Sequence, residues 1–312
     1  PSNAVIPSYD VNSIYQVPQL LSKSKLDDLV IKKLKIKPIK AKNLTVWENF
    51  EILESKTKED LKIFIIGKYV HLKDSYKSLY EAIYHAGIHN QANVMIKWID
   101  SETINKKNVN ELLKSASGIL IPGGFGNRGI PGKLEAIKFA RENNVPFLGI
   151  CLGMQLTIIE YVRNVIRLKN SGSSEFGKYK NNIISLMTEW NLKNKKIKRS
   201  KENDLGATMR LGAYPCFIKK NSLASKIYRK KMISERHRHR YEVNPKFKSI
   251  IEKGDLIFSG FSKDKKLLEI VENKNHKWFL AVQYHPELKS KPFKPHPIFL
   301  SFIKNSLAHK NV

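Results

Sequence analysis

The feature that most limits the fold is a series of short apolar runs, each followed by a loop and a helical pattern. The first run, Leu61 to Ile66, is unbroken and closed by Gly67, as in strands that are buried on both faces of a parallel sheet. Strand patterns follow over 92–100, 118–121 and 145–150, with helical patterns over 75–87 and 132–143. This alternation predicts an α/β fold with an open, mostly parallel sheet and helices on both faces. Ligands of such sheets bind beyond the carboxyl ends of the strands.

The first 57 residues follow a different pattern. They hold one short helical pattern within 13–34, a proline and the stretch 43–55, with no strand series and too little apolar content for a core. We interpret 1–57 as the tail of a preceding domain plus a linker, and 58–312 as the α/β domain. The chain begins with Pro1 and lacks the basic and apolar regions of a signal peptide, so we expect it to be a piece of a longer protein.

The chain carries 56 lysines and arginines against 28 acidic residues, a formal net charge of +28, which attracts anionic partners. The lysines are spread along the whole chain without interleaved aromatic residues, so we expect no specific nucleic-acid partner. No window approaches 18 uninterrupted apolar residues, and we expect no membrane span. The two cysteines make no disulfide framework, which favours a reducing, cytoplasmic location.

One cysteine lies where an apolar run turns into a helical pattern. Cys151 stands between two glycines in "GICLG", the form of a nucleophile elbow, in which small neighbours leave the central side chain exposed above the sheet. The amides at the start of the following helix favour thiolate over thiol, and the amide of Leu152 would face an oxyanion on an attacked carbonyl. The alternative is a buried, inert cysteine, which is how we interpret Cys216.

A thiolate nucleophile needs a base, and the best candidate follows the apolar run 278–282. His285 lies just beyond this predicted strand, and Glu287 can orient its imidazole. Taken alone, "HPE" is more typical of a loop, but with Cys151 it gives a Cys-His-Glu triad at one edge of the sheet. The glycine-rich stretch 121–129 ends a further strand, and its amides can complete an oxyanion hole. The alternative for this stretch is a phosphate-binding loop, although it matches neither common glycine pattern.

At "GICLGMQ", "PGGFG" and "HPE" the sequence resembles the class I glutamine amidotransferases, a flavodoxin-like α/β family that hydrolyses glutamine through a cysteine thioester. Longer stretches, among them "GKYVHLKDSYKSLYEA", "GATMRLGAYPC" and "ERHRHRYEVN", are similar to the glutaminase domain of the CTP synthase family. The similarity covers residues 5–308. Residues 10–22 resemble the last piece of that family's synthetase domain.

The resemblance implies a role for each residue that matches a family motif. The implied triad is Cys151 as nucleophile, His285 as base and Glu287 as its orienting group, and the implied oxyanion amides are those of Leu152 and of Gly123 or Gly124. Glutamine recognition is implied for Gln155, Glu175 and Arg240. A carboxylate suits the α-amino group of glutamine, and a guanidinium suits its α-carboxylate.

A regulatory site is implied by the same resemblance. Residues 199–210, "RSKENDLGATMR", match a lid over the glutamine site, beside which GTP acts as an activator in the family. Phe125 would stack on guanine, while Arg199 and Arg210 would meet the phosphates. The family's "LGGTMRLG" is here "LGATMRLG", so Ala207 replaces a glycine and would stiffen the lid. On composition alone, this segment is a solvated, charged surface loop.

The resemblance also implies the wider reaction. Ammonia would pass to the protein's own N-terminal synthetase domain, missing here, which converts UTP to CTP with ATP and Mg²⁺. No cofactor or metal is expected in the present domain, and the full-length enzyme is expected to be a homotetramer. The alternative from a different class of protein is a non-catalytic regulatory domain of the same fold that binds a ligand or a partner.

Overall fold

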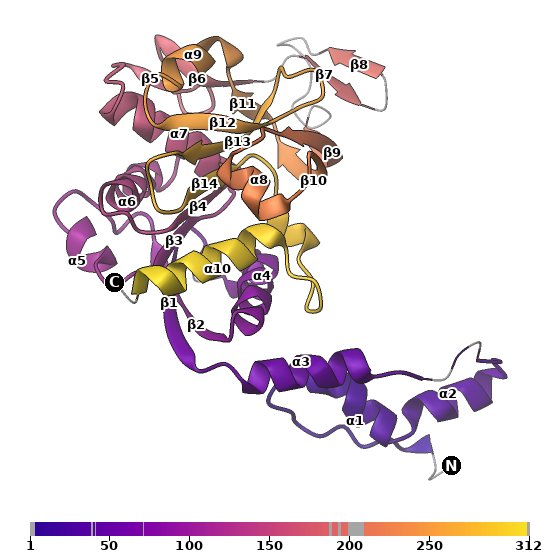
Figure 1. Cartoon of the computed structure of the whole chain (residues 1–312). Helices are drawn as coiled ribbons and strands as arrows, with labels where there is room; N and C mark the ends of the chain where they lie inside the picture. Colours follow the sequence, from indigo (N-terminus) through magenta and orange to yellow (C-terminus); the bar gives the residue numbers. More distant parts are fainter. Residues whose placement is uncertain are drawn as a thin grey trace.

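The computed structural model describes residues 4–310 apart from 39, 41, 71, 187–188, 193–194 and 199–208. Within these residues a nine-stranded sheet forms the centre of the α/β domain (Figure 1). In spatial order its strands are β10 (Met232–His239), β9 (Arg210–Ile218), β12 (Leu256–Phe261), β13 (Leu268–Asn273), β14 (Phe279–Val282), β4 (Phe147–Ile150), β3 (Gly118–Ile121), β1 (Glu59–Gly67) and β2 (Ala92–Asp100).

The half of the sheet from β2 to β14 is parallel. β1 pairs in parallel with β2 and β3, and β4 pairs in parallel with β3 and β14. This confirms the predicted α/β fold and the strand patterns over 92–100, 118–121 and 145–150. β13, β12, β9 and β10 extend the sheet with antiparallel pairing, which the sequence patterns did not indicate.

Two smaller sheets accompany the large one. The first contains β5 (Ser171–Ser173), β6 (Asn181–Leu186) and β11 (Tyr241–Val243), and the second pairs β7 (Glu189–Leu192) with β8 (Lys195–Lys198). Their strands lie between β4 and β12 in the chain. Short 3₁₀ helices include η3 (Lys73–Tyr76), which precedes the first domain helix, and η6 (Pro286–Lys289), which follows β14.

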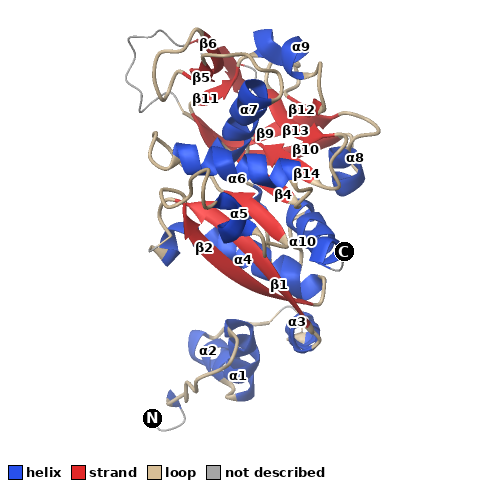
Figure 2. Cartoon of the chain, turned by 90° about the vertical axis from the view of Figure 1, so that its left-hand side faces the viewer, coloured by secondary structure: helices blue, strands red, loops and turns tan. Residues whose placement is uncertain are grey.

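Helices cover both faces of the large sheet, as predicted (Figures 1 and 2). One face carries α4 (Lys77–His89), α8 (Leu223–Tyr228) and α10 (Pro297–Lys310), and the other carries α5 (Val109–Leu113), α6 (Ile130–Glu142), α7 (Leu152–Asn164) and α9 (Lys248–Ile251). Alternate residues of β1 explain this arrangement. Ile63 and Ile65 join the core with α4 and α10, whereas Phe64 and Ile66 join the core with α6 and α7. None of the helices in the described parts of the chain is long and apolar enough to cross a membrane.

The N-terminal segment is more helical than the sequence predicted. It forms α1 (Val17–Lys23), α2 (Leu26–Leu34) and α3 (Thr45–Ser55), where we expected one short helical pattern and a linker. In both views α1 and α2 lie apart from the sheet, and α3 leads into β1 (Figures 1 and 2).

Aromatic side chains hold this segment against the α/β domain. Phe50 of α3 is 1% exposed, and its ring centroid lies 4.8 Å from that of Tyr15 and 5.7 Å from that of Phe293. The Tyr15 hydroxyl donates to Glu81 at 2.7 Å and lies 2.5 Å from Nε2 of His85, both on α4. The segment therefore has a buried contact with the domain, although its own apolar content is low.

We expect Phe50→Ala to release residues 4–55 from the α/β domain, because truncating a buried phenylalanine costs about 3–5 kcal/mol of packing free energy. Limited trypsin digestion should then cleave at the lysines of the segment faster than in the parent, while the α/β domain stays resistant. Ile52→Ala on the same helix is the matched control, since Ile52 is 50% exposed and its truncation costs little. Equal cleavage rates in the parent and in Phe50→Ala would contradict docking through this contact.

Candidate active site

Cys151 lies on a sharp turn between β4 and α7. Its φ of +52° and ψ of −101° form a conformation that costs on the order of 1–3 kcal/mol for a residue with a side chain. Glycines make the turn possible. A Cβ on Gly149 would lie 2.9 Å from the Cβ of Ala281, and a Cβ on Gly153 would lie 2.3 Å from the carbonyl oxygen of Ile121. The predicted strand-to-helix turn is therefore present, with the thiol at the carboxyl end of β4.

The turn places Cys151 at a cavity of about 520 Å³. The residue is 3% exposed, and its Sγ lies 3.9 Å from the carbonyl oxygen of Arg238 and 3.8 Å from Nε2 of Gln283. Other lining residues come from the loops after β1, β3 and β14 and from the start of α4, among them Tyr69, Ser78, Gly123, Phe125, His285 and Glu287. The cavity thus lies beyond the carboxyl ends of the parallel strands, as expected for this fold.

His285 follows β14 and reaches this cavity. Its backbone N–H donates to the carbonyl oxygen of Arg236 at 2.8 Å, and its Nδ1 lies 2.7 Å from Oε1 of Glu287. Its Nε2 is buried and has no hydrogen-bond partner among the residues that the structure describes. A Cβ on Gly123 would lie 2.7 Å from Cε1 of His285 and 3.5 Å from the Cβ of Cys151, so the imidazole and the thiol flank the same glycine.

Charge governs the protonation state of His285. Burial lowers the pKa of His285, but the negative charges of Cys151 and Glu287 raise it more, to about 11. The imidazolium form of His285 is therefore favoured at neutral pH. Cys216 differs, because burial raises the pKa of its thiol well above the usual value. Cys216 is a core cysteine, as predicted.

The glycine-rich loop after β3 lies beside the thiol and the imidazole. Gly124 borders the start of α7, since a Cβ there would lie 3.5 Å from Cδ2 of Leu152. Lys68, which follows β1 and is 6% exposed, donates from Nζ to the carbonyl oxygen of Phe125 and holds the loop. The structure thus brings the predicted oxyanion residues together at the edge of the cavity.

Glu175 and Arg240 meet at the same loop. Oε1 of Glu175 accepts a hydrogen bond from the backbone N–H of Gly126 at 2.8 Å. Burial raises the pKa of Glu175, against the effects of the Gly126 N–H, Lys68 and Arg240. The guanidinium carbon of Arg240 lies 5.9 Å from the ring centroid of Phe125, which lines the cavity. A carboxylate and a guanidinium therefore border the loop that carries the predicted oxyanion amides.

Gln155 lies in the first turns of α7 and is 3% exposed. Its Nε2 donates to the carbonyl oxygen of Tyr241 at 2.9 Å and to Oε1 of Gln283 at 3.3 Å. Both amide hydrogens are thus used inside the protein, and Gln155 is not part of the cavity lining given by the described residues. Gln155 is linked to Cys151 through Gln283, whose Nε2 lies 3.8 Å from Sγ.

The structure contradicts the expectation that Arg210 lies on a surface lid. Arg210 is the first residue of β9 and is 2% exposed, with ion pairs to Glu242 at 3.1 Å and to Glu269 at 2.7 Å. Burial lowers the pKa of Arg210, but the two carboxylates raise it above its usual value. A guanidinium held between two buried carboxylates is not available to a phosphate. The other predicted lid positions, Arg199 and Ala207, lie outside the described residues.

Several residues of the site were not predicted from the sequence, among them Lys68, Tyr69 and Gln283. Lys68 and Tyr69 could have been predicted as site residues, because they directly follow a predicted strand. In sheets of this kind, ligands bind beyond the carboxyl ends of the strands. Gln283 directly follows β14 and comes two residues before His285, so it also lies beyond a predicted strand. Its partner Gln155 gave no local signal for this contact.

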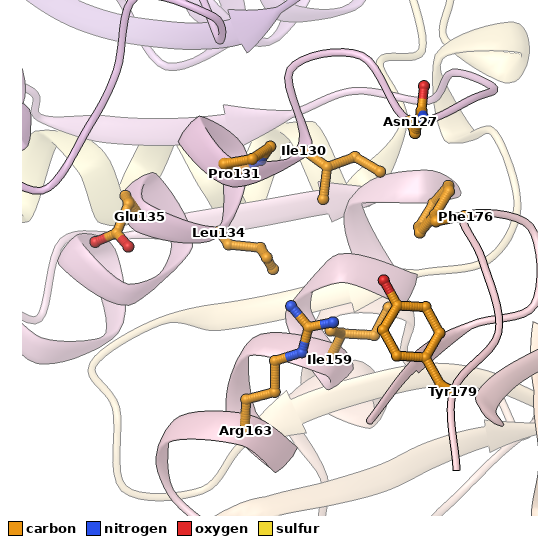
Figure 3. Close-up of a pocket in the computed structure, with 9 residues that line it drawn as sticks. All are labelled: Asn127, Ile130, Pro131, Leu134, Glu135, Ile159, Arg163, Phe176 and Tyr179. Atoms are coloured by element: carbon orange, nitrogen blue, oxygen red, sulfur yellow. The ribbon is translucent and has the colours of Figure 1, made fainter. Parts of the chain in front are cut away.

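A second cavity, of about 340 Å³, lies between α6, α7 and the loop after β5 (Figure 3). Arg163 borders it, with the guanidinium carbon 5.6 Å from the ring centroid of Tyr179 and Nε donating to the carbonyl oxygen of Ser171. Leu134 and Ile159 supply apolar walls. Among the described residues, its lining includes none of the predicted site residues, so we assign it no part in catalysis.

Comparison with known proteins agrees with this geometry. A family model described as glutamine amidotransferase class-I matches residues 71–305. The CTP synthase of Pelagibacter ubique is 54% identical over 306 residues, which cover 98% of this chain and 57% of that protein. The CTP synthase of Parvibaculum lavamentivorans is 48% identical over 301 residues, which cover 96% of this chain and 56% of that protein.

Among solved structures, the glutaminase domain of Trypanosoma brucei CTPS with bound acivicin is 36% identical, with a TM-score of 0.72. The match covers 80% of this chain and 94% of that chain. The present chain thus spans somewhat more than half the length of the CTP synthases it matches, and almost the whole of the trypanosomal glutaminase domain. It therefore belongs to the class I glutamine amidotransferase family and, within that family, to the glutaminase part of the CTP synthases.

Proposed function

We propose that this chain hydrolyses L-glutamine with a catalytic triad of Cys151, His285 and Glu287. One observation carries the proposal: a cysteine on a strained turn shares a cavity with an imidazole whose Nδ1 lies 2.7 Å from a carboxylate. The Nε2 of that imidazole has no hydrogen bond of good geometry within the described part of the chain, and the neighbouring Cys151 raises the pKa of the ring, so Nε2 is the atom that can hold the proton given up by the thiol. Membership of the glutamine amidotransferases supports glutamine as the substrate.

The proposed reaction passes through a thioester. His285 takes the thiol proton on Nε2, and the thiolate of Cys151 attacks the side-chain carbonyl carbon of glutamine. The amides of Leu152 and of Gly123 or Gly124 stabilise the resulting oxyanion. The imidazolium gives its proton to the departing nitrogen, which leaves as ammonia. Water then attacks the thioester, loses a proton to His285, and releases glutamate and the free thiol.

Glu175 and Arg240 are the proposed contacts for the amino-acid end of glutamine. A carboxylate pairs with the α-amino group, and the planar guanidinium forms two parallel hydrogen bonds with the α-carboxylate. Two contacts support these assignments. The Gly126 N–H fixes Glu175, and the Phe125 ring lies under the guanidinium of Arg240. The trypanosomal relative, which holds acivicin, supports a ligand site in this fold.

In the full-length protein, we propose that the ammonia passes to a synthetase domain that converts UTP to CTP with ATP and Mg²⁺. The support is the similarity to CTP synthases, of which the matched residues cover 57% and 56% of the length. A homotetramer is the expected assembly, and the cytoplasm is the expected location.

Replacing the nucleophile tests the proposal directly. We expect Cys151→Ala to abolish glutamate release from glutamine in the full-length protein, because no thioester can form. Cys216→Ala is the matched control and should stay active, since that thiol is buried in the core. An electrophilic glutamine analogue should add to Cys151 in the parent, as measured by mass mapping. Unchanged glutamate release in Cys151→Ala would contradict the triad, and a parent without any release would favour the non-catalytic alternative.

The pH dependence of hydrolysis tests the role of Glu287. Its charge, with that of Cys151, holds the pKa of His285 at about 11 against the effect of burial, so the imidazolium persists through neutral pH and is lost as the pH rises through that value. Glu287→Gln should move the alkaline limb of kcat/KM to lower pH and reduce kcat/KM by about 10²–10⁴-fold. Glu287→Asp keeps the charge and should retain part of the activity. An alkaline limb that stays in place in Glu287→Gln would refute this role.

GTP is the proposed activator, on the strength of the family resemblance. Phe125 is 38% exposed and lines the cavity, so its ring can stack on guanine, and Arg199 is the proposed phosphate contact in place of the buried Arg210. In the full-length protein we expect GTP to raise glutamine-dependent CTP formation. Phe125→Ala and Arg199→Ala should weaken this response in a GTP titration, with ammonia-dependent synthesis little changed as the control. Variants that respond to GTP like the parent would leave these residues without a regulatory role.

A further inference from the structure

The sulfur of Cys151 has a neighbour that the proposed reaction leaves unused. Gln283 is fully buried, and its Nε2 lies 3.8 Å from Sγ of Cys151, within hydrogen-bond range for sulfur. Its backbone N–H donates to the carbonyl oxygen of Glu269 at 2.9 Å, which continues the pairing of β14 with β13. The side chain is thus carried on a fixed backbone two residues before the catalytic imidazole.

A chain of hydrogen bonds determines which end of the Gln283 amide faces the sulfur. The carbonyl oxygen of Tyr241 can only accept, so the Gln155 atom 2.9 Å from it must be the amide nitrogen. That nitrogen also lies 3.3 Å from Gln283, which must therefore offer its oxygen. The remaining atom of the Gln283 amide, its nitrogen, is the one that faces Cys151. A main-chain carbonyl thus sets the orientation of both side-chain amides.

This orientation suits the ionised form of the nucleophile. An amide N–H only donates, and a thiolate only accepts, so the contact strengthens when the thiol loses its proton. The carbonyl oxygen of Arg238, 3.9 Å from Sγ, has the opposite preference, because it accepts from a thiol and repels a thiolate. When the thiol proton moves to His285, the attraction of the Gln283 N–H for the thiolate therefore offsets the repulsion between the thiolate and the Arg238 carbonyl oxygen.

We infer that Gln283 is a further catalytic residue, whose amide N–H stabilises the thiolate of Cys151, and that Gln155 is a positioning residue that orients this amide. The inference rests on the proposed function, in which Cys151 is the nucleophile. It gives Gln155 a role that needs no contact with glutamine. Both side chains act from the interior, so substrate binding does not have to order them.

The test measures the thiolate without requiring turnover. The rate at which iodoacetamide alkylates Cys151, followed by mass spectrometry of its peptide across a pH series, reports the thiolate fraction. Gln283→Met keeps the length of the side chain and removes the donor, so the midpoint of the profile should rise by about one pH unit, equivalent to a tenfold change in the thiol equilibrium. Gln155→Met keeps the Gln283 amide but removes the hydrogen bond that fixes its orientation. This variant should raise the midpoint by less than Gln283→Met does.

Cys216 is the control thiol in every sample and should stay unmodified, because it is buried. Gln283→Leu, a second variant without a donor, should shift the midpoint like Gln283→Met, and thermal unfolding shows which variants are folded. If neither Gln283 variant folds, Gln155→Met decides the question. A folded Gln283→Met or Gln155→Met protein with the parent's midpoint overturns the role of the substituted residue. A parent in which Cys151 reacts as slowly as Cys216 at every pH overturns the proposed function instead.

Discussion

Close backbone packing around the turn at Cys151 is the constraint on which the rest of the site depends. At Cys151 a φ of +52° is combined with a ψ of −101°, a sparsely populated conformation that persists only where the surroundings fix it. Here a carbon added at Gly149 of β4 would collide with Ala281 of β14 and with the backbone of Gly153, and a carbon added at Gly153 of α7 would collide with the Ile121 carbonyl of β3. Atoms of the neighbouring strands therefore fix the position of Cys151, and the glycine-rich loop and His285 reach it because their strands end at the same edge.

The antiparallel extension of the sheet supports the base from the other side. Along β10, buried and exposed side chains alternate, with His237 and His239 inside and Arg236 and Arg238 outside. The carbonyl of Arg236 accepts the hydrogen bond of His285 N–H, so this edge strand positions the imidazole through its main chain. Burial, followed by the charge of Arg210, lowers the pKa of His237 and of His239 well below the usual value, and both rings are neutral. The inner face of β10 is thus a polar core.

Local patterns were sufficient to predict the parallel half of the sheet and to place Cys151 and His285 at its carboxyl edge. Strands buried on both faces leave unbroken apolar runs, and a sharp turn into a helix leaves glycines around Cys151. The same reasoning failed for β10, whose inward side chains include Glu235 and His237, because polar groups that pair with one another inside a protein look like surface residues in a sequence. Gln283 needs a partner 128 positions away, which no local pattern reveals. Glu175 and Arg240 were found only through the family resemblance.

Glu242 and Glu269, buried beside Arg210, are two of several glutamates whose charge is removed from the surface, and this affects how the protein responds to ionic strength. Acidic groups are withdrawn from the surface more often than basic ones: among the described residues the buried glutamates are Glu160, Glu235, Glu242, Glu269 and Glu272, and the buried cations are Lys68, Lys133 and Arg210. The exterior is therefore more positive than the formal +28 indicates. Glutamine has no net charge, so the field of this exterior does not steer its approach. A nucleoside triphosphate such as the proposed activator would be drawn in over about one Debye length, roughly 8 Å at physiological salt, so added salt should slow its association more than that of glutamine.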